Sequence, residues 1–378
     1  MTIDPRQAHD PYIGLSSTIS WLIDAAGEAP SAEQFLAKLG KCLVADGVPL
    51  TGGALTMAVP HPLIAKRTWL WRAENGEVIE ALGFVTGGLP GAELSNQDQA
   101  GDAGKRWLTS IAAGDVREDR VGQGPDGASF SWVGPRPFRP DEASQLRQAA
   151  RFASAPLAAL TARATLTAAL EAYLGRRSAA RVLAGPLRRN LGETIKAALL
   201  FADLRGFTAL SESNSPSAVI SALDAWFDRI AGSVHAFGGE VLKFIGDGVL
   251  AIFPVAGGPP RAACDAALRA VSAARSGMAH LNEARRRQGQ ASLPFGVALH
   301  VGEILWGNIG AADRLDFTAI GPAVNLVSRL EGLCRPLDKV VLVSGAFAAE
   351  SGTPLVPLGN HALRGIASPC AVYTVPED

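Results

Sequence analysis

The sequence predicts an α+β protein of two domains, and three observations support this prediction. The chain has 378 residues, which at roughly 150 residues per domain suggests two domains and a connector. Apolar residues make up 48% and charged residues 19% of the chain, enough apolar side chains for packed cores. Helix-like and strand-like patterns of apolar residues occur in both halves. We expect domains at 1–139 and 193–378, joined by a helical connector at 140–192.

The first domain is expected to combine helices with short strands. Residues 10–50 have apolar side chains at helical spacing, interrupted near Gly27 and Pro30. Residues 86–128 are rich in Gly, Asp and Gln and are predicted to form long loops. A small sensory module of the GAF or PAS kind has this order of elements, so by fold analogy we expect a regulatory domain. The strand-like segments are 54–59, 67–71, 78–84 and 129–133.

The connector has a helical pattern from residue 140 to residue 174. Its leucines near heptad spacing are Leu157, Leu160, Leu170 and Leu174. Two interpretations remain open: an amphipathic helix that caps the first domain, or a parallel two-stranded coiled coil that joins two copies of the chain. Pro156 argues against one unbroken helix.

The second domain alternates helices with hairpins, which predicts a sheet covered by helices. Its clearest helix has Trp226, Ile230 and Val234 on one face and ends at two glycines. The expected elements are strand 195–201, helix 218–237, hairpin 240–253, helix 261–287, hairpin 295–307, strand 316–320, helix 323–333, strand 339–344 and strand 371–375.

Composition excludes several classes of protein. The net charge is −1, so no overall basic field is available to hold nucleic acid or anionic lipid. The four cysteines lie far apart, which supports neither a disulfide framework nor a zinc ribbon. The N-terminal residues lack the apolar stretch of a signal peptide, and no run of about 18 uncharged apolar residues occurs. We therefore expect a cytoplasmic protein without a membrane span.

Asp203 is the first candidate for a metal ligand. It follows the apolar run 198–201 and precedes Gly206 and a helical segment. A carboxylate at the end of a strand can bind a cation, and backbone N–H groups of the following turn, at Phe207 and Thr208, can hold phosphate oxygens. Taken alone, Asp203 could equally serve to turn the chain.

Asp247 is the second candidate, at the tip of the hairpin 240–253. It lies between two glycines, which by itself is a common turn device. If the fold brings two such carboxylates together, they favour a metal site rather than a simple turn. A pair of Mg²⁺ ions is typically held by such carboxylates together with phosphate oxygens of the substrate.

A third segment, 316–331, combines a strand, a Gly-Pro turn and a helix. Pro322 suits the first position of the helix. Asn325 and Arg329 are four residues apart and therefore share one face of that helix. Such a pair on its own is often only solvated.

Together, the three segments resemble the catalytic domain of class III nucleotidyl cyclases, the family of adenylate and guanylate cyclases, over residues 193–376. The motifs occur in the order of that family, whereas a Walker A motif, a strand-linked G-x-G-x-x-G and the kinase signatures are missing. The resemblance implies a ferredoxin-like βαββαβ-type sheet covered by helices. It also implies that Asp203 and Asp247 bind two Mg²⁺ or Mn²⁺ ions.

The resemblance assigns further roles residue by residue. Lys243 and Thr318 take the positions that select adenine. Asn325 takes that of the ribose-orienting asparagine and Arg329 that of the transition-state arginine. Arg364 is the candidate for a basic residue that contacts the triphosphate. One departure is Pro322-Ala323, where relatives frequently have Asp-Thr.

The reaction implied is the conversion of ATP to 3′,5′-cyclic AMP and pyrophosphate. Lys243 and Asp247 are neighbours on one hairpin, yet they must meet opposite ends of ATP. The family resolves this with a head-to-tail dimer, so a homodimer with two shared active sites is implied. The first domain would then regulate the dimer. The Lys/Thr combination resembles a subclass often associated with bicarbonate stimulation, which makes bicarbonate or an unidentified small molecule the candidate regulator.

Three other functions compete with an adenylate cyclase. A guanylate cyclase would need Glu-like chemistry at position 243, where this chain has Lys. A catalytically silent nucleotide-binding regulator would have lost one of the metal-binding, Asn or Arg residues, and none is missing. An interaction scaffold would explain the first domain but not the assembled set. A fourth possibility, a diguanylate cyclase, is disfavoured because Val241 replaces a required acid.

Overall fold

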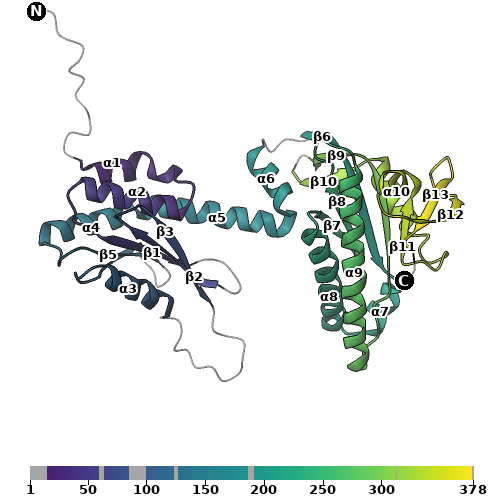
Figure 1. Ribbon diagram of the computed structural model, residues 1–378, viewed down its shortest axis with the longest axis horizontal. Coiled ribbons are helices and arrows are strands. Elements are labelled where there is room, and N and C mark those ends of the chain that lie inside the picture. Colours follow the sequence, from purple (N-terminus) through teal and green to yellow (C-terminus); the bar gives the residue numbers. More distant parts are fainter. Residues whose placement is uncertain are drawn as a thin grey trace, which may run out of the picture. The chain divides into compact units, whose positions relative to one another are not determined.

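The computed structural model describes residues 15–58, 64–84, 99–122, 127–185, 191–311 and 313–376. The chain divides into two compact units, Met1–Leu166 and Thr167–Asp378. Each unit combines a sheet with covering helices (Figure 1), so the predicted α+β class is confirmed. The division falls within a long helix of the expected connector.

The first unit is built on a five-stranded antiparallel sheet of order β3-β2-β1-β5-β4. Helices α1, α2 and α4 and the start of α5 pack on one face, and α3 packs on the other. Its elements are α1 (Ser17–Asp24), a 3₁₀ turn (Ala26–Glu28), α2 (Ala32–Ala45), β1 (Gly52–Ala58), β2 (Ile64–Arg72), β3 (Val78–Phe84), α3 (Gln99–Ile111), β4 (Arg117–Val121), β5 (Ala128–Val133), α4 (Pro140–Phe152) and α5 (Ser154–Leu174).

The prediction of long loops at 86–128 is wrong for residues 99–111, which form α3, and for residues 117–121, which form β4, whereas residues 86–98 and 123–126 lie outside the described residues. Leu108 is fully buried on the sheet, and Trp107 and Ile111 pack beside it. These three residues at i, i+1 and i+4 are the helical signal. The surrounding Gly, Asp and Gln obscured it.

The connector region contains α4, α5 and α6 (Arg176–Ala184). Helices α4 and α5 are separate, and Pro156 lies in the first turn of α5, where proline is tolerated. Leu157 and Leu160 are buried in the core of the first unit, as expected for a helix that caps it. Further along, Leu166 and Tyr173 are 53% and 89% exposed. The coiled coil stays a prediction.

The second unit is built on an eight-stranded sheet. Its strand order is β12-β13-β11-β9-β6-β8-β7, and β10 pairs with β9. All pairs are antiparallel except β11 with β9. Its elements after α6 are β6 (Leu191–Leu204), α7 (Phe207–Ser213), α8 (Pro216–Ala236), β7 (Glu240–Ile245), β8 (Gly248–Pro254), α9 (Arg261–Arg287), β9 (Phe295–Gly310), β10 (Leu315–Ile320), α10 (Pro322–Glu331), β11 (Val341–Ser344), α11 (Gly345–Glu350), β12 (Val356–His361) and β13 (Cys370–Thr374).

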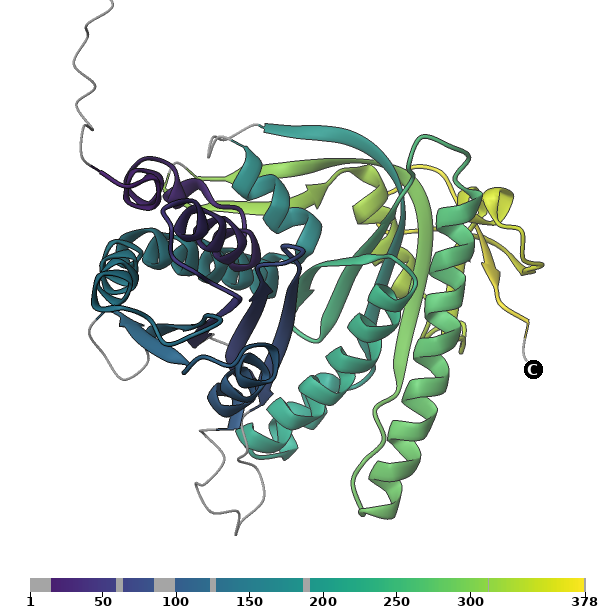
Figure 2. The same cartoon turned by 60° about the vertical axis from the view of Figure 1, so that its left-hand side comes forward.

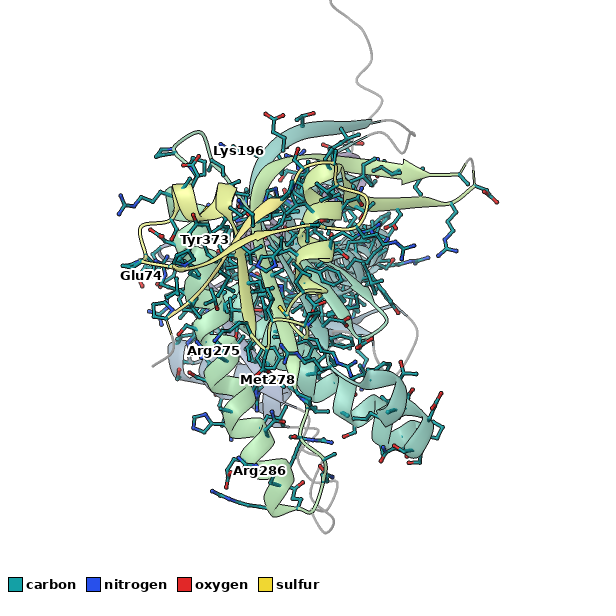
Figure 3. All side chains as sticks on the ribbon, turned by 90° about the vertical axis from the view of Figure 1, so that its right-hand side faces the viewer. Glu74, Lys196, Arg275, Met278, Arg286 and Tyr373 are labelled. Carbon is teal, nitrogen blue, oxygen red and sulfur yellow. The ribbon has the colours of Figure 1, made fainter. Side chains whose placement is uncertain are left out.

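Helices α8 and α9 lie side by side over one face of this sheet (Figure 2), and α10 covers the other face. The Ser215 side chain caps α8 by accepting a hydrogen bond from the N–H of Ala218. Helix α9 runs 27 residues. Figure 3 labels Met278 and Arg286 along it: Met278 is fully buried in the core, whereas Arg286 lies in the exposed last turn.

The predicted hairpin at 295–307 is wrong, because residues 295–310 form one continuous strand, β9. Gly302 does not turn the chain. Instead it lies opposite Ala197 of β6, in a ladder that runs from Leu191 to Leu204. The hairpin is made by β9 with β10. Within the described ranges, no helix is both long and apolar enough to cross a membrane.

Candidate active site

Asp203 lies one residue before the end of β6, opposite Gly296 of β9. Its side chain is half-buried, and its Oδ1 accepts a hydrogen bond from the N–H of Leu204 at 3.2 Å. The apolar run that precedes Asp203 forms the buried centre of the sheet. The end of β6 therefore holds this carboxylate at the edge of the core.

Asp247 lies in the two-residue turn between β7 and β8. Gly246 supplies the left-handed backbone of this turn, with φ of +64°. The indole N–H of Trp226 donates a hydrogen bond of 2.8 Å to the carbonyl oxygen of Asp247, which ties the turn to α8. Because β8 pairs with β6, the turn falls beside Asp203: a Cβ on Gly248 would lie 3.6 Å from Asp203 Oδ1.

The structure thus brings the two predicted metal ligands together. Burial is the main cause that raises the pKa of Asp203 to about 7, and a hydrogen bond and charge repulsion from Asp247 add to it. Two carboxyl groups this close must share a proton or a cation. Carboxylate oxygens suit Mg²⁺, which usually takes one or two of them and completes its shell with water and substrate phosphates. Among the described residues, no cluster of three His, Cys, Asp or Glu side chains forms a ready-made metal cage.

Two residues near this pair escaped the sequence analysis. Glu331, at the end of α10, lies over the backbone of Gly296, where a Cβ would be 2.3 Å from its Oε1. Burial raises the pKa of Glu331, and the Arg205 guanidinium opposes that rise. Arg205 also donates to the carbonyl oxygen of Cys334 at 3.2 Å. Both residues stood inside the quoted motifs, but only the fold shows that the Glu331 carboxyl lies close enough to raise the pKa of Asp203 and that Arg205 acts on Glu331.

Phe207 and Thr208 begin α7, directly after Gly206 with φ of +76°. The turn and the short helix are as the motif implies. Phe207 is half-buried and, with Gly206, lines a cavity of about 340 Å³ between α7 and residues 291–294. Thr208 is exposed.

Lys243 and Thr318 lie on β7 and β10, two strands whose residues approach each other. The Lys243 ammonium forms an ion pair with the carboxylate of Asp316. Asp316 and Thr318 are two residues apart on β10 and therefore project from the same side of the strand. Asp316 is a third residue that the sequence analysis missed. It lies in the motif segment 316–331, but nothing in that segment indicates that Asp316 pairs with Lys243.

Asn325 and Arg329 share one face of α10, as the four-residue spacing predicted, and both side chains are exposed. Val327 and Leu330 anchor the buried side of this helix. Arg329 donates a hydrogen bond of 2.9 Å to the backbone carbonyl of Arg364. The predicted triphosphate contact therefore lies next to the predicted transition-state arginine.

The predicted residues fall into separate groups within one chain. One group is the carboxyl pair with the turn that follows Asp203, a second is the β7–β10 pair, and a third is α10 with residue 364. In the part of the chain that the structure describes, no hydrogen bond or ion pair joins Asp203 or Asp247 to Lys243, Asn325 or Arg329.

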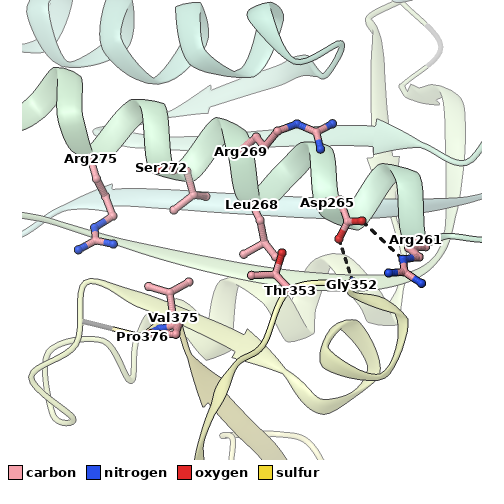
Figure 4. Close-up of a pocket in the computed structure, with 11 residues that line it drawn as sticks. Arg261, Asp265, Leu268, Arg269, Ser272, Arg275, Gly352, Thr353, Val375 and Pro376 are labelled. Carbon is pink, nitrogen blue, oxygen red and sulfur yellow. Dashed lines mark hydrogen bonds and ion pairs between the residues drawn. The ribbon is translucent and has the colours of Figure 1, made fainter. Parts of the chain in front are cut away.

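A further cleft of about 510 Å³ lies between α9 and the C-terminal segment (Figure 4), and it contains none of these groups. Asp265 accepts a hydrogen bond of 2.9 Å from the N–H of Gly352 and pairs with Arg261 at 3.8 Å. Arg275 lines the other part of the cleft. These arginines are fourteen positions apart on one helix, too far to converge on one small ligand.

Comparison with known proteins shows which proteins the second unit is similar to. Residues 192–350 match the family model described as adenylate and guanylate cyclase catalytic domain. Adenylate cyclase 1 of Rhizobium meliloti is 33% identical over 178 residues, which are 47% of this chain and 27% of the relative. The adenylate cyclase of Anabaena cylindrica is 30% identical over 165 residues, which are 43% of this chain and 32% of that relative. The matched region thus spans less than a third of either relative.

A solved structure supports the fold over a larger share of the chain. The structure of a bacterial light-regulated adenylyl cyclase aligns with a TM-score of 0.50 and 21% identity. The alignment covers 74% of this chain and 90% of that one. At this identity the likeness concerns the fold alone.

Proposed function

Residues 192–350 form a catalytic domain of the adenylate and guanylate cyclase family, and from this premise we propose that the chain is an adenylate cyclase. The proposed reaction converts ATP to 3′,5′-cyclic AMP and pyrophosphate. Named adenylate cyclases among the relatives support ATP as the substrate. So does Lys243, whose ammonium is a donor that suits the N1 acceptor of adenine.

The observation that carries the proposal is the hydrogen-bonded carboxyl pair of Asp203 and Asp247. This pair would hold two Mg²⁺ or Mn²⁺ ions, with phosphate oxygens of ATP as further ligands. When bound, such ions lower the pKa of the ribose 3′-hydroxyl and neutralise charge on the triphosphate. The strand end and the glycine turn keep both carboxylates in place before substrate arrives.

The other groups would act on different parts of ATP. Arg329 would stabilise the charge that develops on the α-phosphoryl group, an effect on the order of several kcal/mol. Asn325 would orient the ribose and reduce the entropy cost of ring closure. Arg364 and the backbone N–H groups of Phe207 and Thr208 would hold the phosphates, and Lys243 with Thr318 would read the adenine edge.

The separate groups favour a site that two copies of the chain complete. One copy would supply Asp203 and Asp247, and its partner would supply Lys243, Thr318, Asn325 and Arg329. Because every chain carries both sets, a symmetric homodimer would have two complete sites. The first unit, of GAF or PAS kind, would then regulate activity by shifting the dimer between open and closed states in response to bicarbonate or another small molecule.

Product analysis tests this proposal directly. The purified chain is incubated with Mn²⁺ and either ATP or GTP, and the products are separated by chromatography. We expect cyclic AMP and pyrophosphate from ATP. Asp203→Asn and Asp247→Asn should each lower turnover at least about a hundredfold, with the folded state retained by circular dichroism. Asp228→Asn, which removes an exposed carboxylate from α8, is the matched control and should leave turnover unchanged.

Two outcomes would contradict the proposal in different ways. Faster turnover of GTP than of ATP would reject the assignment of the base and favour a guanylate cyclase. Binding of nucleotide without turnover of either would favour the silent regulator.

A further inference from the structure

We propose that Arg205 is a positioning residue for α10, although it lies in the segment that carries Asp203. Its guanidinium anchors the loop that follows α10, residues 332–340, and thereby holds Asn325 and Arg329 in place. This inference rests on the proposed function, because it concerns the site that these two side chains complete. Arg205 has none of the roles that the family resemblance assigns.

The first observation is the direction of the Arg205 side chain. Its backbone N–H donates a hydrogen bond of 2.8 Å to the carbonyl oxygen of Pro294, just before β9. Its Nη2 donates to two further carbonyl oxygens, that of Cys334 at 3.2 Å and that of Lys339. Among the described residues, no hydrogen bond or ion pair joins the guanidinium to Asp203. The guanidinium therefore points into the loop after α10.

The second observation is that the two carbonyl groups lie at the two ends of one turn. The N–H of Lys339 donates a hydrogen bond of 3.0 Å to the same oxygen of Cys334. Between them, Asp338 has a left-handed backbone with φ of +48°, which is uncommon outside glycine. Arg205 thus closes the turn 334–339 from the side of β6, and a guanidinium has enough donors for such a bridge.

The same turn is tied directly to the helix. The N–H of Cys334 donates a hydrogen bond of 2.7 Å to the carbonyl oxygen of Glu331, the last residue of α10. Cys334 is fully buried, in one core cluster with Val327 and Leu330 of that helix. A continuous path of hydrogen bonds therefore runs from Arg205 to the end of α10.

The third observation is a glycine where the end of α10 contacts the sheet. Gly296 of β9 pairs with Asp203. A Cβ on Gly296 would lie 2.3 Å from Glu331 Oε1 and 3.0 Å from Cys334 Cβ. Because position 296 has no side chain, the end of the helix lies directly on the strand. This close packing and Arg205 fix the same end of α10.

The position of α10 matters because of the side chains that it presents. Asn325 and Arg329 lie six and two positions before Glu331, on the exposed face. In the proposed function they act on the ribose and the α-phosphoryl group of ATP held by the carboxylates of the other copy. A displacement of about 1 Å in such groups can lower the rate about a hundredfold. Arg205 therefore serves a different active site from its neighbour Asp203.

The test uses mixed dimers with one complete site, purified through a different affinity tag on each chain. One chain has Asp203→Ala and the other has Arg329→Ala. The complete site then takes its carboxylates from the second chain and α10 from the first. We expect Arg205→Met in the Asp203→Ala chain to lower kcat roughly tenfold or more, with KM for ATP changed by less than about threefold. In the Arg329→Ala chain, whose α10 is already disabled, Arg205→Met should change kcat by less than about threefold.

Two further variants provide a rescue and a control. Because one nitrogen of Arg205 donates to both carbonyl oxygens, the ammonium of Arg205→Lys has enough donors to replace it. Arg205→Lys in the Asp203→Ala chain should therefore restore most of kcat. Arg335→Met removes an exposed guanidinium from the same loop and should leave kcat unchanged.

Amide hydrogen exchange, followed by mass spectrometry, gives a readout that does not require turnover. It compares Arg205→Met with the unchanged chain, without nucleotide or metal. We expect the amides of residues 332–340 to exchange at least about tenfold faster in the variant, because the turn loses its bridge. The amides of α8 should keep their rates.

The outcomes separate the inference from the proposed function. A loss of kcat that is as large in the Arg329→Ala chain as in the Asp203→Ala chain shows that Arg205 serves the metal ligand beside it. That result overturns the inference and leaves the adenylate cyclase intact. Unchanged kcat in both placements, or unchanged exchange of the loop, also overturns it. Mixed dimers that are inactive with Arg205 in place contradict the shared site, and the inference with it.

Discussion

His300 is a buried base without a part in the proposed reaction. It lies in β9 with 8% of its surface exposed, and its Nδ1 is 2.8 Å from Ser344 Oγ. The same oxygen accepts a hydrogen bond from the N–H of Phe347 at the start of α11, so the hydroxyl proton can point to Nδ1. This arrangement suits a neutral imidazole with its proton on Nε2. Burial lowers the pKa of His300 to about 4.

The depressed pKa of His300 predicts a loss of stability in mild acid. The unfolded chain takes up this proton near pH 6.5 and the folded chain only near pH 4, so stability present at pH 7 is lost as the pH falls through that window. Between pH 7 and 5 the loss is about 2 kcal/mol. His300→Gln cannot titrate and keeps a partner for Ser344. Between pH 7 and pH 5, the free energy of unfolding of this variant, measured in urea, should therefore fall by about 2 kcal/mol less than that of the unchanged protein. The same fall in both proteins would contradict the assignment.

Helix α2 contains a glycine that the packing requires. A Cβ on Gly40 would lie 2.5 Å from the ring of Trp71, which is 1% exposed. In α8, by contrast, a Cβ on Gly232 would meet no atom within 4 Å. The same substitution should therefore act with opposite sign in the two helices.

Alanine at these two positions gives a matched pair. Gly232→Ala should stabilise the second unit by up to about 1 kcal/mol, because alanine is the better helix former. Gly40→Ala should destabilise the first unit by about 1–3 kcal/mol, because overpacking against Trp71 outweighs that gain. Thermal unfolding of the whole chain, followed by circular dichroism, checks both. A higher midpoint in Gly40→Ala would show that Trp71 has room to move.

At the level of elements, the sequence predicted what depends on local pattern and missed what depends on pairing. Helix α9 was expected at 261–287 and lies there, since its apolar face is continuous. A hairpin was expected at 295–307, but pairing with β6 along nearly the whole length of β9 keeps these residues in one strand. A β-bulge at Leu242 in β7 leaves no mark in the apolar pattern, since it is defined by the register of the partner strand. The partner of Lys243 was unpredictable for the same reason.

At the level of the whole molecule, the motifs located the candidate site, and the sheet explains why they meet. Asp203 and Asp247 are 44 positions apart, yet β8 pairs with β6 and brings the turn to the strand end. The proposed dimer is inferred from chemistry, because the residues proposed to contact opposite ends of ATP lie in separate groups of one chain. Leu166 and Tyr173, in the second half of α5, are exposed, and the coiled coil between two copies stays a prediction.

Complementation between two inactive variants tests most directly the claim that two chains share each site. Asp203→Ala removes a metal ligand and Arg329→Ala removes the transition-state arginine. Each variant alone should be inactive. In a mixed dimer, one of the two sites would have every residue. Because half of randomly paired dimers are mixed, co-expression should restore about a quarter of the wild-type cyclic AMP formation.

The control is co-expression of Asp203→Ala with Asp247→Ala, which damages the same half of the site in both chains and should restore nothing. Recovery near one quarter in the first pair and none in the control is the predicted result. If both pairs stay as inactive as the single variants, the two halves of the site do not come from different chains, and the account is contradicted.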